Sequence, residues 1–164
     1  MADASEDYPE RYWKAIEQAG EDVNIYDGPK VFLEQYGKLE PAIGKMLAVH
    51  WCVSEVCNGG FHQLFFNSTG LLVPEAADAF ESFGMTRCAS AVRRAVSRLG
   101  SRYPRERSSR VIRLYRAQLL SFESSETLLD LENTEFYDCY DVEAGGYEIA
   151  GIRYLNSQRG RGVP

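Results

Sequence analysis

The segment SEVCNGGFHQLFFNSTG, residues 54–70, combines a glycine pair with polar side chains set among aromatic ones. A helix expected over Glu40–Asn58 ends at Gly59-Gly60, because glycine adopts backbone angles that other residues avoid. A short turn of helix, Phe61–Asn67, follows, and the residues from Asn67 to Gly70 have the composition of a turn. The sequence therefore predicts two consecutive helices joined at the glycine pair.

The polar side chains of this segment have apolar neighbours, so each needs a hydrogen-bond partner. Glu55 lies one helical turn before the glycines, and we expect its carboxylate to accept hydrogen bonds from the free N–H groups that start the next helix. Asn58 and Asn67 tolerate the backbone angles of helix ends. We expect a structural motif that clamps the two helices, formed by Glu55, Asn58, Gly59, Gly60, Gln63, Asn67 and Gly70.

Two chemical alternatives use the same part of the chain. Glu55 and His62 form a candidate acid–base pair, but no nucleophile, phosphate-binding loop or second carboxylate stands beside them. Four potential metal ligands are also close in sequence, namely His50, Cys52, Cys57 and His62. His50 and Cys52 point apart on a helix, and the spacings match no zinc finger. We expect no catalytic residue, no metal and no other cofactor, and an enzyme centred on Glu55 and His62 stays an alternative.

Apolar spacing predicts further helices on both sides of this segment, and no alternating strand pattern of useful length is present. The expected helices span residues 8–19, 29–36, 74–83, 86–99 and 103–122, with a short helix or strand at 147–155. The core candidates of the 103–122 helix are Val111, Leu114, Tyr115, Leu119 and Phe122. The fold class is therefore all-α, with a single compact multi-helix domain over residues 8–155 and flexible tails at 1–7 and 156–164.

Composition limits the functions that the whole surface can serve. The chain has 164 residues and a formal net charge of −6, which suits one domain and disfavours broad binding to nucleic acid or an anionic membrane. No apolar run approaches the length of a membrane span. Because the first residues are acidic and form no apolar signal segment, we expect a cytoplasmic protein with four reduced cysteines.

Acidic and basic residues are segregated along the sequence. Ten arginines stand between Arg87 and Arg116 against one acid, Glu106, whereas residues 123–148 contain no lysine or arginine. One interpretation pairs the basic helices with acidic segments inside the fold. Another leaves an acidic face for a basic protein partner, and a third uses the arginines to bind nucleic acid. The residues proposed for the acidic face are Glu123, Glu126, Asp130, Glu132, Glu135, Asp138, Asp141 and Glu143, with a second acidic group, Asp3, Glu6, Asp7, Glu10, Glu17, Glu21 and Asp22, near the N-terminus.

Residues 54–70, followed by Pro74-Glu75-Ala76, resemble the signature of the DMP-type bacterial DNA-mimic protein family, a domain of unknown function in most members. Further matches at 27–29, 103–107 and 128–137 extend the resemblance over roughly residues 8–155. The resemblance implies a helical protein without enzymatic activity, whose surface carboxylates imitate DNA phosphates and occupy a basic DNA-binding protein. The family's characterised example is an acidic dimer, so a homodimer is also expected. The arginine-rich middle of this chain restricts such mimicry to a local acidic face.

Overall fold

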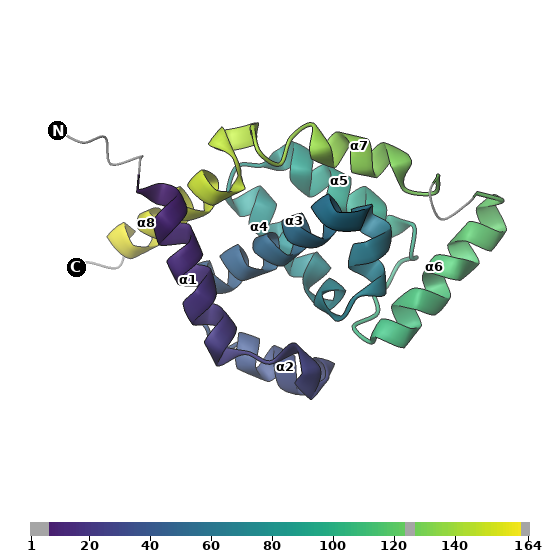
Figure 1. Cartoon of the computed structure of the whole chain (residues 1–164), viewed down its shortest axis with the longest axis horizontal. Coiled ribbons are helices and arrows are strands. Elements are labelled where there is room, and N and C mark those ends of the chain that lie inside the picture. The colour runs from purple at the N-terminus through teal and green to yellow at the C-terminus, as the bar shows by residue number, and fades with distance from the viewer. Residues whose placement is uncertain (1–6, 124–126, 162–164) are drawn as a thin grey trace.

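The computed structural model of the protein describes residues 7–123 and 127–161, and the described residues form helices and no strand (Figure 1). This confirms the predicted all-α single domain. None of the described helices is both long and apolar enough to cross a membrane. The elements are α1 (Tyr8–Asp22), η1 (Ile25–Asp27), α2 (Pro29–Tyr36), α3 (Pro41–Phe66), η2 (Ser68–Leu72), α4 (Val73–Ser82), α5 (Thr86–Ser97), α6 (Arg107–Ser121), α7 (Asp130–Tyr137), η3 (Glu143–Gly145) and α8 (Tyr147–Arg161).

Helix α3 lies at the centre of the molecule, with other helices packed around it (Figure 1). It buries side chains on most of its circumference, as a helix with so broad an apolar surface must. Phe61 of α3 and Phe80 of α4 both meet Phe136 of α7 edge to face, with ring centroids 5.5 and 5.7 Å apart. These aromatic contacts join α7 to α3 and α4, which lie much earlier in the sequence, in one core.

The glycine pair interrupts α3 as predicted, and the two halves follow each other without a loop. Gly59 (φ −163°, ψ 29°) and Gly60 (φ 68°, ψ −175°) leave helical conformation, and the helix resumes at Phe61. A Cβ atom on Gly60 would lie 2.8 Å from the side chain of Asn133, and the positive φ angle also favours glycine. Gly60 therefore allows both the change of direction and the close approach of α7.

Two expectations for helix α6 are wrong, namely its first residue and most of its core residues. It begins at Arg107, because the preceding residues are held in a different conformation: the Tyr103 hydroxyl donates to the Gly70 carbonyl at 2.6 Å. Of its predicted core residues only Leu114 is buried. Tyr115, Leu119 and Phe122 are 55%, 75% and 96% exposed, and α6 lies at the edge of the molecule (Figure 1).

Helix α8 continues to Arg161, so the loose tail expected from residue 156 onward is instead largely helical. Two long-range contacts hold this part of the chain. The Arg159 guanidinium donates to the Glu40 carboxylate at 2.8 Å, and Arg11 donates to Oδ1 of Asn156 at 2.8 Å. Both partners come from segments more than 100 residues away, which explains why local sequence did not indicate them. Residues 1–6 and 162–164 of the expected tails lie outside the described residues.

Candidate functional site

Glu55 is the centre of a polar cluster that spans the glycine pair. Its Oε2 atom accepts hydrogen bonds from Nε2 of Gln63 and Nδ2 of Asn67, both at 2.8 Å. Its Oε1 atom accepts from the hydroxyl of Thr69 at 2.6 Å. A partly buried carboxylate with three donors ties the first half of α3 to its C-terminal turn and to η2. The structure thus brings Glu55, Gln63 and Asn67 together, as the clamp requires.

The N–H groups after the break are capped differently from the expectation, because Glu55 is fully engaged with side chains. The N–H of Phe61 donates to Oδ1 of Asn133 on α7 at 2.8 Å. On the other side of the break, the Tyr137 hydroxyl donates to the carbonyl of Val56 at 2.8 Å. Two side chains of α7, those of Asn133 and Tyr137, therefore form hydrogen bonds with backbone groups on the two sides of the glycine break. Sequence reasoning missed Asn133, since no local signal distinguishes it.

The other members of the predicted motif have separate roles. Asn58 keeps helical angles and is exposed, so it does not form the helix end assigned to it. A Cβ atom on Gly59 would lie 2.3 Å from Oε1 of Gln63, and one on Gly70 would lie 2.1 Å from the carbonyl oxygen of Leu64. Gly70 therefore allows η2 to pass against the backbone of α3.

Arg110, one of the ten arginines between Arg87 and Arg116, is completely buried at the C-terminal end of α3. Its guanidinium donates to the carbonyl oxygens of Phe65 at 3.1 Å, Asn67 at 2.7 Å and Arg105 at 2.5 Å. The last carbonyls of a helix lack intrahelical partners and carry partial negative charge. Arg110 therefore donates hydrogen bonds to backbone carbonyls at the C-terminal end of α3, just as Asn133 accepts one from a backbone N–H group at the glycine break.

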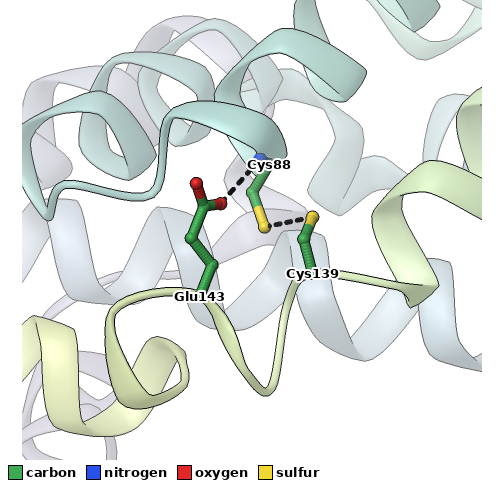
Figure 2. Close-up of side chains that lie close together, drawn as sticks. All are labelled: Cys88, Cys139 and Glu143. Atoms are coloured by element: carbon green, nitrogen blue, oxygen red, sulfur yellow. Dashed lines mark hydrogen bonds between the residues drawn. The ribbon is translucent and has the colours of Figure 1, made fainter.

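The candidate acid–base pair, Glu55 and His62, lies on the two sides of the glycine break. His62 stacks on Phe66 with ring centroids 6.4 Å apart, while Glu55 binds other side chains, so no hydrogen bond joins the proposed acid–base pair within the described chain. Burial lowers the pKa of His62, as it does for His50. The His50, Cys52, Cys57 and His62 group forms no ligand cluster. Among the described residues, the cluster of three potential ligands within 4.8 Å is Cys88, Cys139 and Glu143 (Figure 2).

A cleft of about 680 Å³ lies between α1, α2, the start of α3 and α8. Of the site residues expected from the sequence, its lining includes Asp22, from the second acidic group. Two of its charged groups, Glu40 and Arg159, pair with each other, and Arg11 is bound to Asn156. Three further charged side chains, Lys14, Asp22 and Lys38, also line the cleft.

Most of the arginines between Arg87 and Arg116 form hydrogen bonds or ion pairs within the fold. Arg107, Arg110 and Arg113 donate to backbone carbonyls. Four other arginines form ion pairs with acids: Arg93 with Asp78 and Glu81, Arg94 with Glu135, Arg98 with Glu132, and Arg105 with Glu75. For these residues the structure supports the interpretation in which basic helices pair with acids of the same chain.

The predicted acidic face is divided by these contacts. Glu132 is 1% exposed and forms an ion pair with Arg98, the residue that follows α5, and Glu135 forms one with Arg94 of α5. Glu143 accepts the backbone N–H groups of Arg87 at 2.9 Å and Cys88 at 3.1 Å, so it caps α5 from outside that helix. These three carboxylates form contacts within the fold, so they do not belong to an acidic face that could bind a partner.

Four acids of that face remain exposed: Glu123, Asp130, Asp138 and Asp141. Glu126 lies outside the described residues. Nearer the N-terminus, Asp7 and the α1 residues Glu10, Glu17, Glu21 and Asp22 are also exposed, whereas Asp3 and Glu6 lie outside the described residues. The acidic residues thus divide into an internal set that binds arginines or backbone N–H groups and an external set.

Neither the search of curated proteins nor that of solved structures gave a match. A family model described as DMP19-like protein matches residues 37–157. The matched range includes the glycine break, the Glu55 cluster, the buried Arg110 and the divided acids of α7. The DMP19-like protein family is not a known enzyme family. Because the model covers most of the sequence, the chain belongs to the DMP19-like protein family.

Proposed function

We propose that this protein is a non-catalytic binding protein that presents an acidic face to a basic DNA-binding protein, as a DNA mimic does. A groove that attracts phosphates attracts carboxylates through the same field, so an acidic face competes with DNA for it. Membership of the DMP19-like family supports this proposal. The proposal places the interaction in the bacterial cytoplasm, where DNA and its binding proteins are found.

The division of charge on α7 is the observation that carries the proposal. Glu132 and Glu135 lie on the side that faces the arginines of α5. Asp130 and Asp138, at the two ends of α7, are exposed, and neither forms an ion pair with a described lysine or arginine. Eight residues separate them, or about 12 Å along a helix axis. Together with the exposed Asp141 they form what we call the α7 acidic face.

Helix α1 supplies a second acidic surface. Tyr12, Ile16 and Ala19 form its buried stripe, and Glu10, Glu17 and Glu21 are exposed along the helix. None of the three forms an ion pair with a described basic residue. This surface extends the negative potential of the molecule, and it provides a comparison for the α7 acidic face in binding experiments.

The test begins with the immobilised protein and a bacterial lysate at about 50 mM salt, followed by elution with duplex DNA. A captured DNA-binding protein is then purified, and the protein is titrated against its complex with fluorescent DNA. The wild-type protein should displace the DNA. The triple variant Asp130→Asn/Asp138→Asn/Asp141→Asn should compete about tenfold less well, since three exposed charge contacts contribute about 0.5 kcal/mol each.

The matched control is Asp78→Asn/Glu81→Gln, because these exposed carboxylates already form ion pairs with Arg93. It should compete nearly as well as the wild-type protein. The proposal fails if no DNA-binding protein is captured, or if both variants compete equally. Tight binding of labelled DNA by the protein itself would favour the nucleic-acid-binding alternative instead.

We also propose a homodimer formed through α6. The exposed apolar residues of α6 and its C-cap include Ile112, Tyr115 and Leu119 of the helix and Phe122 directly after it, each more than half exposed. Two α6 helices can pair antiparallel, with the two-fold axis crossing each helix at the level of Ala117. Ile112 then lies opposite Phe122 of the second copy, and Tyr115 lies opposite Leu119. The stripe is thus complementary to itself, as a two-fold interface requires. An apolar patch of this kind on one helix is a typical interaction surface.

Light scattering after size exclusion measures the dimer directly. Leu119→Arg places a charge at the middle of the stripe and should produce a monomer with an unchanged circular dichroism spectrum. Val142→Arg is the control, because Val142 is 62% exposed and belongs to the connection between α7 and α8, which lies away from α6 (Figure 1). A wild-type monomer at all concentrations tested, or a dimer that survives Leu119→Arg, would contradict the α6 interface.

A further inference from the structure

Two buried cysteines meet where α5 begins and α7 has ended. Cys88 lies in the first turn of α5, and Cys139, which is 51 residues later, lies just beyond Asp138, the C-cap of α7. Both side chains are 0% exposed, and their Sγ atoms are 2.7 Å apart. Figure 2 shows the two sulfur atoms directed toward each other, with the Glu143 carboxylate on the adjoining N-terminus of α5.

The separation of the two sulfur atoms distinguishes between a metal site and a disulfide. In a tetrahedral zinc site with Zn–S bonds of about 2.3 Å, the sulfur atoms lie about 3.8 Å apart. A disulfide bond is about 2.05 Å long. From 2.7 Å, the sulfur atoms would have to separate by about 1 Å for zinc, whereas a smaller approach forms the covalent bond.

Glu143 gives a second reason to set the metal site aside. Its two carboxylate oxygens already accept the N–H groups of Arg87 and Cys88 at 2.9 and 3.1 Å. Coordination of a metal would compete with this cap of α5. We therefore propose that Cys88 and Cys139 are an oxidisable dithiol, a modification site that closes to a disulfide on reaction with a peroxide.

The reaction has a defined order. The hydrogen bond from Cys88 lowers the pKa of Cys139, so Cys139 is the sulfur that forms the thiolate and attacks. The thiolate breaks the O–O bond of hydrogen peroxide and becomes a sulfenic acid, and the departing hydroxide takes up a proton to form water. Sγ of Cys88 then attacks Sγ of Cys139, the S–O bond breaks, and a second water forms. Two thiols lose two electrons, and one peroxide is reduced to two waters.

Access to the buried sulfur atoms depends on the connection between α7 and α8. This connection contains η3, and Ala144, Gly145 and Gly146 all have positive φ angles there. Local opening of such short irregular segments occurs without global unfolding. Peroxide reaches Cys139 through such openings, so oxidation of the pair is slower than that of the exposed Cys57. The disulfide then joins α5 to the α7–α8 connection and encloses α6 and α7 in a covalent loop.

The experiment treats the reduced full-length protein with hydrogen peroxide, then denatures it in the presence of an alkylating reagent. Intact mass should show the loss of two alkylated thiols in addition to that of the exposed Cys57, which reacts first. A digest should yield one linked peptide pair containing Cys88 and Cys139, which dithiothreitol separates. In Cys88→Ser the sulfenic acid of Cys139 has no partner, so dimedone should label Cys139. Cys52→Ser, which removes a different buried thiol, should leave the linked pair unchanged.

Thermal unfolding gives an independent readout that needs no variant. A disulfide that closes a loop of about 50 residues should raise the Tm of the oxidised protein by about 10 °C, and dithiothreitol should reverse the rise. Recovery of Cys88 and Cys139 as free thiols after Cys57 has been consumed would overturn the proposal. Binding of one Zn²⁺ that depends on Cys88 and Cys139 and blocks their alkylation would overturn it too, and would assign a metal site.

Discussion

Replacing Arg110 with methionine should lower the free energy of unfolding by about 3 kcal/mol, although the substitution removes a charge from the core. The guanidinium satisfies the carbonyl oxygens of Phe65, Asn67 and Arg105, at 3.1, 2.7 and 2.5 Å. A buried carbonyl left without a donor costs about 1 kcal/mol at the lower end of the usual range, so three such groups cost about 3 kcal/mol. Methionine is long and adaptable enough to fill most of the vacated space, so the cavity adds little.

Urea denaturation and calorimetry measure the effect. For a chain of 164 residues, a loss of about 3 kcal/mol corresponds to a Tm that is about 6–12 °C lower. Arg110→Lys should lie between wild type and methionine, because an ammonium cannot reproduce the planar fork of donors. The matched control is Arg116→Met on the same helix, where the residue is exposed and the change should stay within about 0.5 kcal/mol. If Arg110→Met and Arg116→Met unfold at the same urea concentration, Arg110 does not hold the end of α3.

Three further substitutions test other parts of the account. Gly70→Ala should destabilise the fold by more than about 2 kcal/mol in urea denaturation, because its Cβ would lie 2.1 Å from a backbone carbonyl; unchanged stability would contradict the close approach. Asn133→Ala should cost about 1 kcal/mol in the same assay, since the Phe61 N–H loses its acceptor, and a neutral effect would remove the cap. Burial lowers the pKa of His50, so the unfolded chain binds the proton more tightly and stability falls as the pH drops below about 6.5. His50→Gln should therefore reduce the loss of Tm between about pH 7 and pH 5, and an unchanged pH profile would contradict this assignment.

Local sequence predicted the features that depend on neighbouring residues. The glycine break in α3 and the helices that begin at Tyr8, near Pro74 and at Thr86 follow from spacing, proline positions and glycine. Glu55 was identified as a clamp, but its partners are the side chains of Gln63, Asn67 and Thr69 rather than backbone N–H groups. The choice between these partners depends on the three-dimensional path of η2, which spacing alone does not specify.

The residues that sequence reasoning missed act across long sequence separations. Arg110 binds carbonyls more than 40 residues away, Asn133 caps a helix 72 residues away, and Glu143 caps α5 from 55 residues away. The exposed stripe of α6 was mistaken for core because an apolar helix face looks the same whether the fold or another molecule covers it. In each case the deciding contact is tertiary.

The proposed function requires that the α7 acidic face keeps negative potential that a basic protein can use. The most direct measurement is the salt dependence of affinity for a captured DNA-binding protein, for the wild-type protein and for Asp130→Asn/Asp138→Asn/Asp141→Asn. We expect the affinity of the wild-type protein to fall steeply between about 50 and 200 mM salt, and the logarithmic slope to be clearly shallower for the triple variant. Equal slopes for the two proteins would contradict the claim, because the three carboxylates would then take no part in binding.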